Sequence, residues 1–209
     1  MRSKRKKHGA ERLEACSAFL TDPASAGNYA ALFGNGNPVR VEIGCGKGDF
    51  IVGTAANEPQ VNFLAVERVH DVLMMAAEKV RDADLTNVRL CLADVKDLQL
   101  PAGSVDRLYL NFSDPWPKNR HAKRRLTARS FLQQYEKFLR PGGQLCFKTD
   151  NAPLFEFTLE ELQAAGWTVD SKTDDLHASP ENEGNVETEY ERRFSALGFP
   201  IHRVVAHKH

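Results

Sequence analysis

The sequence predicts an α/β fold in which a mostly parallel sheet is covered by helices on both faces. From Val39 onward, short apolar runs typical of buried strands alternate with helical patterns. A glycine-rich turn joins the first of these strands to the first helix. The chain has 209 residues and is 42% hydrophobic, which is enough for one sizeable core.

Each predicted element follows from its own pattern. Apolar runs bounded by polar or turn residues predict strands over 39–43, 62–66, 88–92, 105–112 and 144–148, with another beginning at Trp167. Amphipathic spacing predicts helices over 49–57, 69–81, 128–139 and 153–164. The Pro141-Gly142-Gly143 run predicts a turn before residue 144. Residues 189–196 and 201–206 suggest a last strand or hairpin.

The chain divides into two predicted regions. Residues 1–38 comprise a basic tail over residues 1–8, a short helix over residues 11–20 and a linker rich in Gly, Asn, Ala and Pro. Residues 39–209 contain the alternating strands and helices, and we expect them to form the single functional domain.

Composition excludes several classes. The 28 basic and 28 acidic residues cancel, so a polyanionic partner would need a local basic patch. The four cysteines are scattered without a CxxC pair, which suggests neither a disulfide framework nor a metal site. No apolar run approaches the roughly 20 residues of a membrane helix, and no signal peptide is apparent. We therefore expect a cytoplasmic protein with no membrane association.

The first informative motif is the stretch from Glu42 to Gly48, where a predicted strand ends and a helix begins. Gly44, Gly46 and Gly48 allow a sharp turn and a close approach of backbone to ligand. The spacing is GxGxG, whereas the dinucleotide fingerprint is GxGxxG. The carboxylate of Glu42 would repel phosphates, but it suits a positively charged sulfonium and an amino acid.

Two further acids follow the next strands. Glu67 ends the second strand, where it could accept hydrogen bonds from the hydroxyls of a ribose, and Asp94 follows the third, near an adenine edge. Glycine-rich turns and single acids occur in many α/β proteins. The three acids together nevertheless favour a cofactor site at this edge of the sheet.

The most unusual segment spans residues 110–125 and begins at the end of the fourth strand. Pro115 and Pro117 stiffen the chain around Asp114 and Trp116, and a stiff loop can hold a reactive geometry. Trp116 is read as a packing residue in preference to a base-stacking platform. A cluster of basic residues follows, and its charge suits binding to RNA phosphates. Alternatively, these side chains only form the solvent-exposed start of the next helix. The cluster consists of Lys118, Arg120, His121, Lys123, Arg124 and Arg125.

Residues 41–48, 111–125 and 188–191 resemble the bacterial tRNA (guanine-N7-)-methyltransferases that modify guanosine 46 in the variable loop. The string Ser-Asp-Pro-Trp-Pro-Lys-x-Arg-His-x-Lys-Arg-Arg is highly specific to that family, and the resemblance extends over residues 39–195. It implies a Rossmann-like class I methyltransferase fold with a seven-stranded, mostly parallel sheet. It also implies S-adenosyl-L-methionine (SAM) as methyl donor, no metal, tRNA as partner, and a monomer or homodimer.

The resemblance also implies roles for individual residues. Asp114 is the expected catalytic residue. The residues expected at the cofactor are Glu42, Gly44, Gly46, Glu67, Asp94 and Asp114. The residues expected at the substrate are Lys118, Arg120, His121, Lys123, Arg124, Arg125, Asp150, Thr188 and Glu191.

The expected chemistry needs little from the protein beyond positioning and electrostatics. Guanine N7 carries an in-plane lone pair, so an in-line attack on the methyl group requires no general base. Methylation leaves the purine cationic, and a carboxylate at Asp114 or Asp150 would then bind it more strongly. Lys148, at a strand end, is interpreted as a lysine that extends toward solvent.

Two rival classes remain. An NAD-linked oxidoreductase would share the fold and Glu67, but it would require GxGxxG and would not need the basic string. A non-catalytic RNA-binding module would use the basic string, but it would not need acids at several strand ends. Methylation at cytosine C5 is disfavoured because no cysteine lies in a Pro-Cys or comparable loop.

Overall fold

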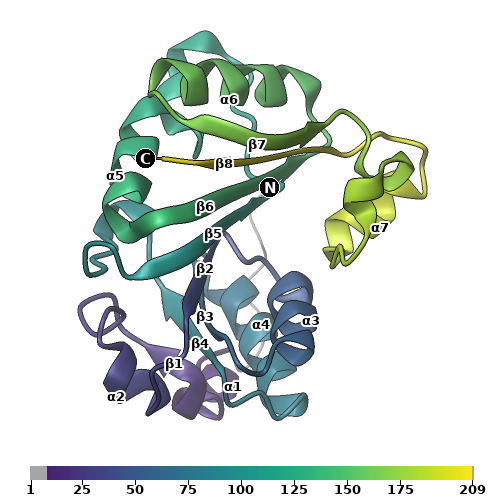
Figure 1. The fold of residues 1–209 in the computed structure, drawn as a ribbon. Coiled ribbons are helices and arrows are strands. Elements are labelled where there is room, and N and C mark those ends of the chain that lie inside the picture. The colour runs from purple at the N-terminus through teal and green to yellow at the C-terminus, as the bar shows by residue number, and fades with distance from the viewer. Residues whose placement is uncertain (1–8, 209) are drawn as a thin grey trace. The chain divides into compact units, whose positions relative to one another are not determined.

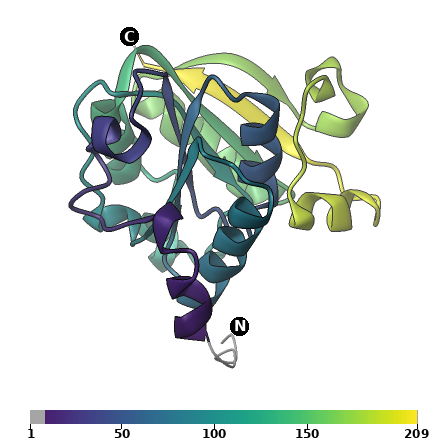
Figure 2. The same cartoon turned by 90° about the horizontal axis from the view of Figure 1, so that it is seen from below.

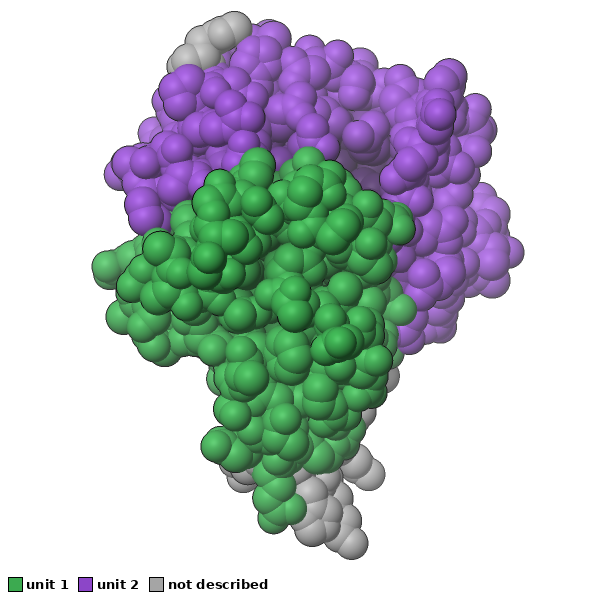
Figure 3. Space-filling view, turned by 60° about the horizontal axis from the view of Figure 1, so that its bottom comes forward, with its two compact units in different colours: residues 1–100 green, residues 101–209 purple. Residues whose placement is uncertain are grey.

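The computed structural model describes residues 9–208 and divides the chain into two compact units, residues 1–100 and 101–209 (Figure 3). The expected basic tail over residues 1–8 lies outside the described residues. The compact units divide the chain after residue 100, whereas the sequence predicts a boundary after residue 38. The units do not test that boundary, so the assignment of residues 39–209 to one domain stays a prediction.

The first unit contains four parallel strands in the order β1-β4-β3-β2 (Figure 1). Their bounds are β1 Leu20–Thr21, β2 Val39–Ile43, β3 Asn62–Glu67 and β4 Val88–Leu92. Its helices are α1 Gly9–Glu14, α2 Tyr29–Phe33, α3 Asp49–Asn57 and α4 His70–Asp82, and short 3-10 turns cover Ser17–Phe19 and Val95–Asp97. Since all four strands run in parallel, their carboxyl ends share one edge.

The strand β3 forms because four consecutive residues of its six, Phe63 to Val66, are apolar and buried on both faces, as in a parallel sheet covered by helices. Helix α4 forms because its buried residues recur at helical spacing: Leu73, Met74, Ala77 and Val80 are fully buried. Helix α1 lies beside α4 (Figure 2), where the guanidinium of Arg12 donates two hydrogen bonds of 2.7 Å to the Glu78 carboxylate.

The second unit has the strand order β5-β6-β8-β7. Its strands are β5 Val105–Asn111, β6 Leu139–Thr149, β7 Thr168–Thr173 and β8 His202–His207. Strands β5 and β6 are parallel, whereas β8 runs antiparallel to both β6 and β7. Its helices are α5 Arg129–Phe138, α6 Ala152–Ala164 and α7 Glu189–Ser195, and 3-10 turns cover Asn119–Arg124, Leu176–Ala178 and Pro180–Asn182.

The expected α/β fold is confirmed, and most predicted strands and helices end within a few residues of the observed ones. The helix predicted over residues 11–20 is an exception, because α1 ends at Glu14 and the 3-10 turn Ser17–Phe19 and β1 follow it. The strand count differs, because the described residues contain eight strands where seven were expected. The two-residue β1 pairs with β4 through Leu20 and Leu90, inside the segment expected to be a helix and linker. Two residues give too short a pattern to be recognised.

Two further differences have local causes. The expected turn at Pro141-Gly142-Gly143 lies inside β6, where Leu139 pairs with Val105 and Gln144 with Arg107, so the extra residues bulge from the ladder. The expected strand over residues 189–196 is wrong, because residues 189–195 form α7. Thr188 caps this helix, and Glu191 completes a capping box.

Candidate functional site

The turn after β2 is tight because its glycines adopt a left-handed backbone. Gly44, Gly46 and Gly48 have φ angles of +76°, +58° and +83°, which residues with a side chain rarely adopt. A Cβ on Gly48 would lie 2.8 Å from the Cβ of Ala76, so packing requires this glycine. At Gly44 and Gly46, no described atom beyond the glycine and its two chain neighbours lies within 4 Å of the Cβ position. Bare backbone is therefore open to a ligand at these two residues.

The glycine turn is held against the neighbouring strand β3. The amides of Gly44 and Cys45 both donate to the carbonyl oxygen of Val66, at 2.8 and 3.1 Å. These bonds fix the first half of the turn before any ligand binds, which lowers the entropy cost of binding.

Glu67 at the end of β3 organises the second half of the turn. Its Oε2 accepts from the Gly46 amide at 3.2 Å, and its Oε1 accepts from the amides of Arg68 and Val69, each at 2.9 Å. A carboxylate has about four lone-pair positions, so one position remains for a ligand hydroxyl. The carboxylate is thus already oriented by three backbone donors.

The three acids predicted at the cofactor lie on the same edge of the first unit's sheet. Glu42 is 1% exposed near the end of β2, Glu67 ends β3, and Asp94 follows β4. The Asp94 Oδ1 accepts from the Lys96 amide at 3.0 Å, which orients this carboxylate too. The structure thus brings Glu42, Glu67 and Asp94 to the edge where ligands of parallel sheets bind.

The buried thiol of Cys45 lies near the carboxylates of Glu42 and Glu67 at this edge. Burial raises the pKa of its thiol well above the ordinary value, and the carboxylates of Glu42 and Glu67 raise it further. The thiol therefore stays protonated and is a poor nucleophile. The two carboxylates favour a positive charge beside the glycine turn. This edge fits a cationic ligand that also carries hydroxyl groups.

In the second unit, the chain leaves β5 through a strained loop. Phe112 and Trp116 have φ angles of +53° and +42°, outliers for bulky residues. The two residues flank Asp114, whose side chain is exposed. The Phe112 amide donates to the carbonyl oxygen of Lys148 at 2.9 Å, which fixes the start of the loop on β6. Strain of this kind persists only where neighbouring contacts enforce it, and it is enriched at active sites.

Arg125 fixes the other end of this loop. Its guanidinium donates to the carbonyl oxygens of Pro115 and Trp116, at 3.0 and 3.2 Å, and lies 4.3 Å from the ring centroid of Phe157. Trp116 in turn packs against Arg124, at 5.0 Å from the ring centroid, and against His121. Arg125 is therefore a structural part of the loop, although the sequence suggested only contact with substrate.

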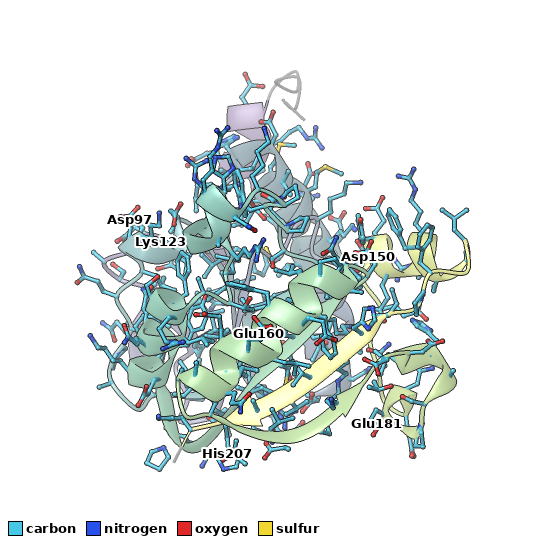
Figure 4. All side chains as sticks on the ribbon, turned by 90° about the horizontal axis from the view of Figure 1, so that it is seen from above. Asp97, Lys123, Asp150, Glu160, Glu181 and His207 are labelled. Atoms are coloured by element: carbon cyan, nitrogen blue, oxygen red, sulfur yellow. The ribbon has the colours of Figure 1, made fainter. Side chains whose placement is uncertain are left out.

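The rest of the basic string is available at the surface. Lys118 and Arg120 are exposed before and within the 3-10 turn Asn119–Arg124, as are Lys123 and Arg124, while His121 is half-buried. Figure 4 shows Lys123 well apart from Asp150, which lies at the amino end of α6 near α7. The structure thus places the cationic turn and Asp150 in different parts of the second unit.

A buried ion pair joins β6 to α7. The Nζ of Lys148 lies 2.6 Å from the Oε2 of Glu191, and these side chains are 5% and 0% exposed. The Lys148 Nζ also donates to the Asn185 Oδ1 and to the Val186 carbonyl oxygen, each at 3.0 Å. The sequence-based interpretation of Lys148 as extending toward solvent is wrong, because the segment before α7 covers its amine.

Glu191 is the centre of a larger network. Its Oε1 accepts from the Asn185 side-chain amide at 2.9 Å and lies 3.2 Å from the Nε2 of His177. Its own amide donates to the Oγ1 of Thr188 at 2.8 Å. Thr188 and Glu191 are thus brought together as a helix cap, and Glu191 faces the protein interior.

The pairing of Lys148 with Glu191 and the contact of Tyr190 with Asp150 were not predicted from the sequence. The Tyr190 hydroxyl donates to the Asp150 Oδ2 at 3.4 Å. Burial is the larger cause that raises the pKa of Tyr190, and the Asp150 carboxylate raises it further. A lysine within the apolar run of β6 and the Thr-x-x-Glu signature at residue 188 were the available signals.

Among residues 9–208, no group of three or more His, Cys, Asp or Glu side chains is arranged to hold a metal ion. In the same part of the chain, no helix has both the length and the apolar character to cross a membrane.

The fold is that of known methyltransferases. An antibiotic-related methyltransferase superposes with a TM-score of 0.64 over 87% of this chain and 92% of that chain, at 18% identity. The 16S rRNA methyltransferase KamB gives a TM-score of 0.66 over 85% of this chain and 90% of that chain, at 17% identity. At such low sequence identity, the structural likeness supports the Rossmann-like fold and does not indicate the substrate.

Sequence comparison is more specific. The family described as "Putative methyltransferase" matches residues 36–204. A tRNA (guanine-N(7)-)-methyltransferase of Limosilactobacillus fermentum is 47% identical over 99% of this chain and 98% of that protein. Proteins of the same name from Exiguobacterium sibiricum and Listeria monocytogenes serotype 4b are 50% and 45% identical, over 92% and 99% of this chain and 92% and 98% of their own lengths. The chain therefore belongs to the tRNA (guanine-N(7)-)-methyltransferase family.

Proposed function

We propose that this protein transfers the methyl group of SAM to N7 of a guanine in the variable loop of tRNA, at position 46. The observation that carries the proposal is the likeness of nearly the whole chain to proteins named for that reaction. The acidic edge of the first unit and the stiff Asp114 loop of the second supply the chemistry that the reaction needs.

The first unit is proposed to hold SAM. When bound, SAM supplies an electrophilic methyl group on a positively charged sulfur. Burial raises the pKa of Cys45, and the nearby carboxylates of Glu42 and Glu67 raise it further. The two negative charges would also stabilise a bound cation. The open backbone at Gly44 and Gly46 allows close approach. Asp94 and the remaining lone pair of Glu67 accept from hydroxyl or amine groups of the ligand.

Asp114 is proposed as the catalytic residue because its loop leaves the side chain exposed on a strained, fixed backbone. Guanine N7 needs no deprotonation, so the carboxylate acts by electrostatics. It accepts hydrogen bonds from N1–H and the exocyclic amine of the base, an arrangement that adenine cannot reproduce. It also interacts more strongly with the cationic product-like ring than with neutral guanine.

Asp150 and Thr188 are proposed as further substrate contacts, and Glu191 as the residue that positions them. Glu191 is completely buried and paired with Lys148, so its contribution is to order the segment that carries Thr188 and Tyr190. Lys118, Arg120, His121, Lys123 and Arg124 are proposed to contact tRNA phosphates, because their side chains lie on an exposed or half-buried cationic turn.

The test is direct. The protein is incubated with unmodified tRNA and methyl-labelled SAM, and N7-methylguanosine is mapped by chemical cleavage of the tRNA. The proposal predicts label at one variable-loop guanine. Label on another base, or transfer to a small molecule in preference to tRNA, would refute it.

A further inference from the structure

Three of the most exposed large apolar side chains among residues 9–208 lie within ten positions of one another. Tyr190, Leu197 and Phe199 are 43%, 64% and 50% exposed, and every other large apolar residue in that part of the chain is less exposed. Soluble proteins seldom gather such side chains without a binding role. All three belong to α7 and the segment that follows it.

These side chains continue a row of rings, which we call the aromatic ladder: Phe112, Tyr190, Phe194 and Phe199. The ring centroids of Phe112 and Tyr190 are 5.1 Å apart, those of Tyr190 and Phe194 are 4.1 Å apart and nearly parallel, and those of Phe194 and Phe199 are 5.6 Å apart. The separations of the first and last pairs are within the usual range for favourable aromatic contacts. The Tyr190 and Phe194 rings lie closer, in a stacked arrangement. The ladder runs from the half-buried ring of Phe112 to the exposed ring of Phe199.

The inner end of the ladder lies at the proposed reaction site. Phe112 precedes Asp114 by two residues and shares the strained loop. Tyr190 donates its hydroxyl hydrogen bond to Asp150. The neighbouring residue Glu191 is fixed by its buried ion pair with Lys148. The ladder is therefore a rigid extension of the residues assigned to the guanine.

The outer end carries positive charge. Arg192 and Arg193 are exposed on α7, and the guanidinium of Arg193 lies 5.9 Å from the ring centroid of Phe194. Aromatic rings interleaved with arginines are the combination that binds unpaired RNA, because rings stack on bases while cations bind phosphates. A protein partner is less favoured, because an apolar contact over these rings would desolvate the exposed arginines beside them.

Resting on the function proposed above, we propose that the outer ladder, Phe194 and Phe199 with Leu197, stacks against a nucleotide adjacent to the target guanine. Removing a guanine from its stack exposes the faces of its neighbours. A ring surface continuous with the catalytic loop provides a replacement stacking partner. The occupant is thus the unstacked RNA strand next to the methylated base.

The experiment compares Phe199→Ala with wild type, using Val169→Ala as the matched control. Val169 is also exposed, at 39%, but lies on β7. The proposal predicts that Phe199→Ala raises the KM for tRNA and the Kd for tRNA about tenfold, in line with the loss of one base–aromatic stack. SAM affinity, melting temperature and kcat stay near the wild-type values. Phe199→Trp restores the tRNA affinity, and Val169→Ala leaves it unchanged.

Salt dependence separates stacking from charge. Stacking releases no counterions, so Phe199→Ala should leave the slope of log Kd against log salt unchanged, whereas Lys123→Ala should lower it by about one. An unchanged tRNA Kd in Phe199→Ala overturns the proposal. The proposal is also overturned if wild type is a dimer, Phe199→Ala is a monomer and the two bind tRNA equally well. The outer ladder would then bind a second copy of the chain. If wild type makes no N7-methylguanosine, the proposed function is refuted. The Kd values of wild type and Phe199→Ala for tRNA still show whether the outer ladder binds RNA.

Discussion

Replacing Lys148 by methionine tests the buried network most severely, because it leaves the Glu191 carboxylate, which is 0% exposed, without its cation. Breaking a buried ion pair by removing one partner costs about 3–5 kcal/mol, since a charge is left uncompensated. For a chain of this size, 1 kcal/mol corresponds to about 2–4 °C in Tm. Lys148→Met should therefore lower the Tm by roughly 6–20 °C.

A second variant separates the ion pair from the packing. In Lys148→Met with Glu191→Gln, the uncompensated charge is gone and a neutral side chain still accepts from Asn185. We expect the double variant to be more stable than Lys148→Met alone, by about 1–3 kcal/mol. The assay is reversible urea unfolding of the four proteins of the cycle, followed by tryptophan fluorescence. A loss below about 1 kcal/mol in Lys148→Met, or strictly additive effects, would refute the reasoning.

Three further predictions follow from the site. Asp114→Asn should reduce kcat by about 10²- to 10³-fold, as for loss of one preorganised electrostatic group. The Tm should be unchanged because Asp114 is exposed. A kcat near that of wild type would contradict the catalytic role. Lys123→Ala with Arg124→Ala should weaken tRNA binding and lower the salt slope by about two while SAM affinity is kept; an unchanged slope would remove these residues from the RNA contact. Burial, with Asp22 as a lesser cause, raises the pKa of Cys91 to about 11, so its contribution to stability is complete below pH 9 and is lost as the pH rises toward 11. Urea unfolding from pH 8 to 11 should show this loss in wild type and a smaller loss in Cys91→Ala, and identical profiles would contradict it.

The sequence predicted most of the fold because the parallel strands are continuous apolar runs. Strands β2 and β4 and helix α3 begin and end at the predicted residues. The failures occurred where the pattern was short or the signal was a side-chain contact. Strand β1 has two residues, and α7 depends on the cap formed by Thr188 and Glu191. Periodicity alone reveals neither.

The candidate site was predictable in its parts. Acids after successive parallel strands must share an edge, so Glu42, Glu67 and Asp94 could be grouped from the sequence. Arg125 and Lys148 could not be placed in this way. Whether a basic side chain binds RNA, fixes a loop or enters a buried ion pair depends on partners far away in the sequence, such as Phe157 for Arg125.

Replacing one atom of the RNA tests directly whether guanine N7 is the methyl acceptor. A tRNA carrying 7-deazaguanosine at the variable-loop target retains the Watson–Crick edge that Asp114 is proposed to bind, but it lacks the N7 lone pair. We expect this tRNA to bind with an affinity within about twofold of normal tRNA, to inhibit methylation of normal tRNA and to accept no methyl group. Methyl transfer to the 7-deazaguanosine tRNA at a rate comparable with normal tRNA would contradict this expectation.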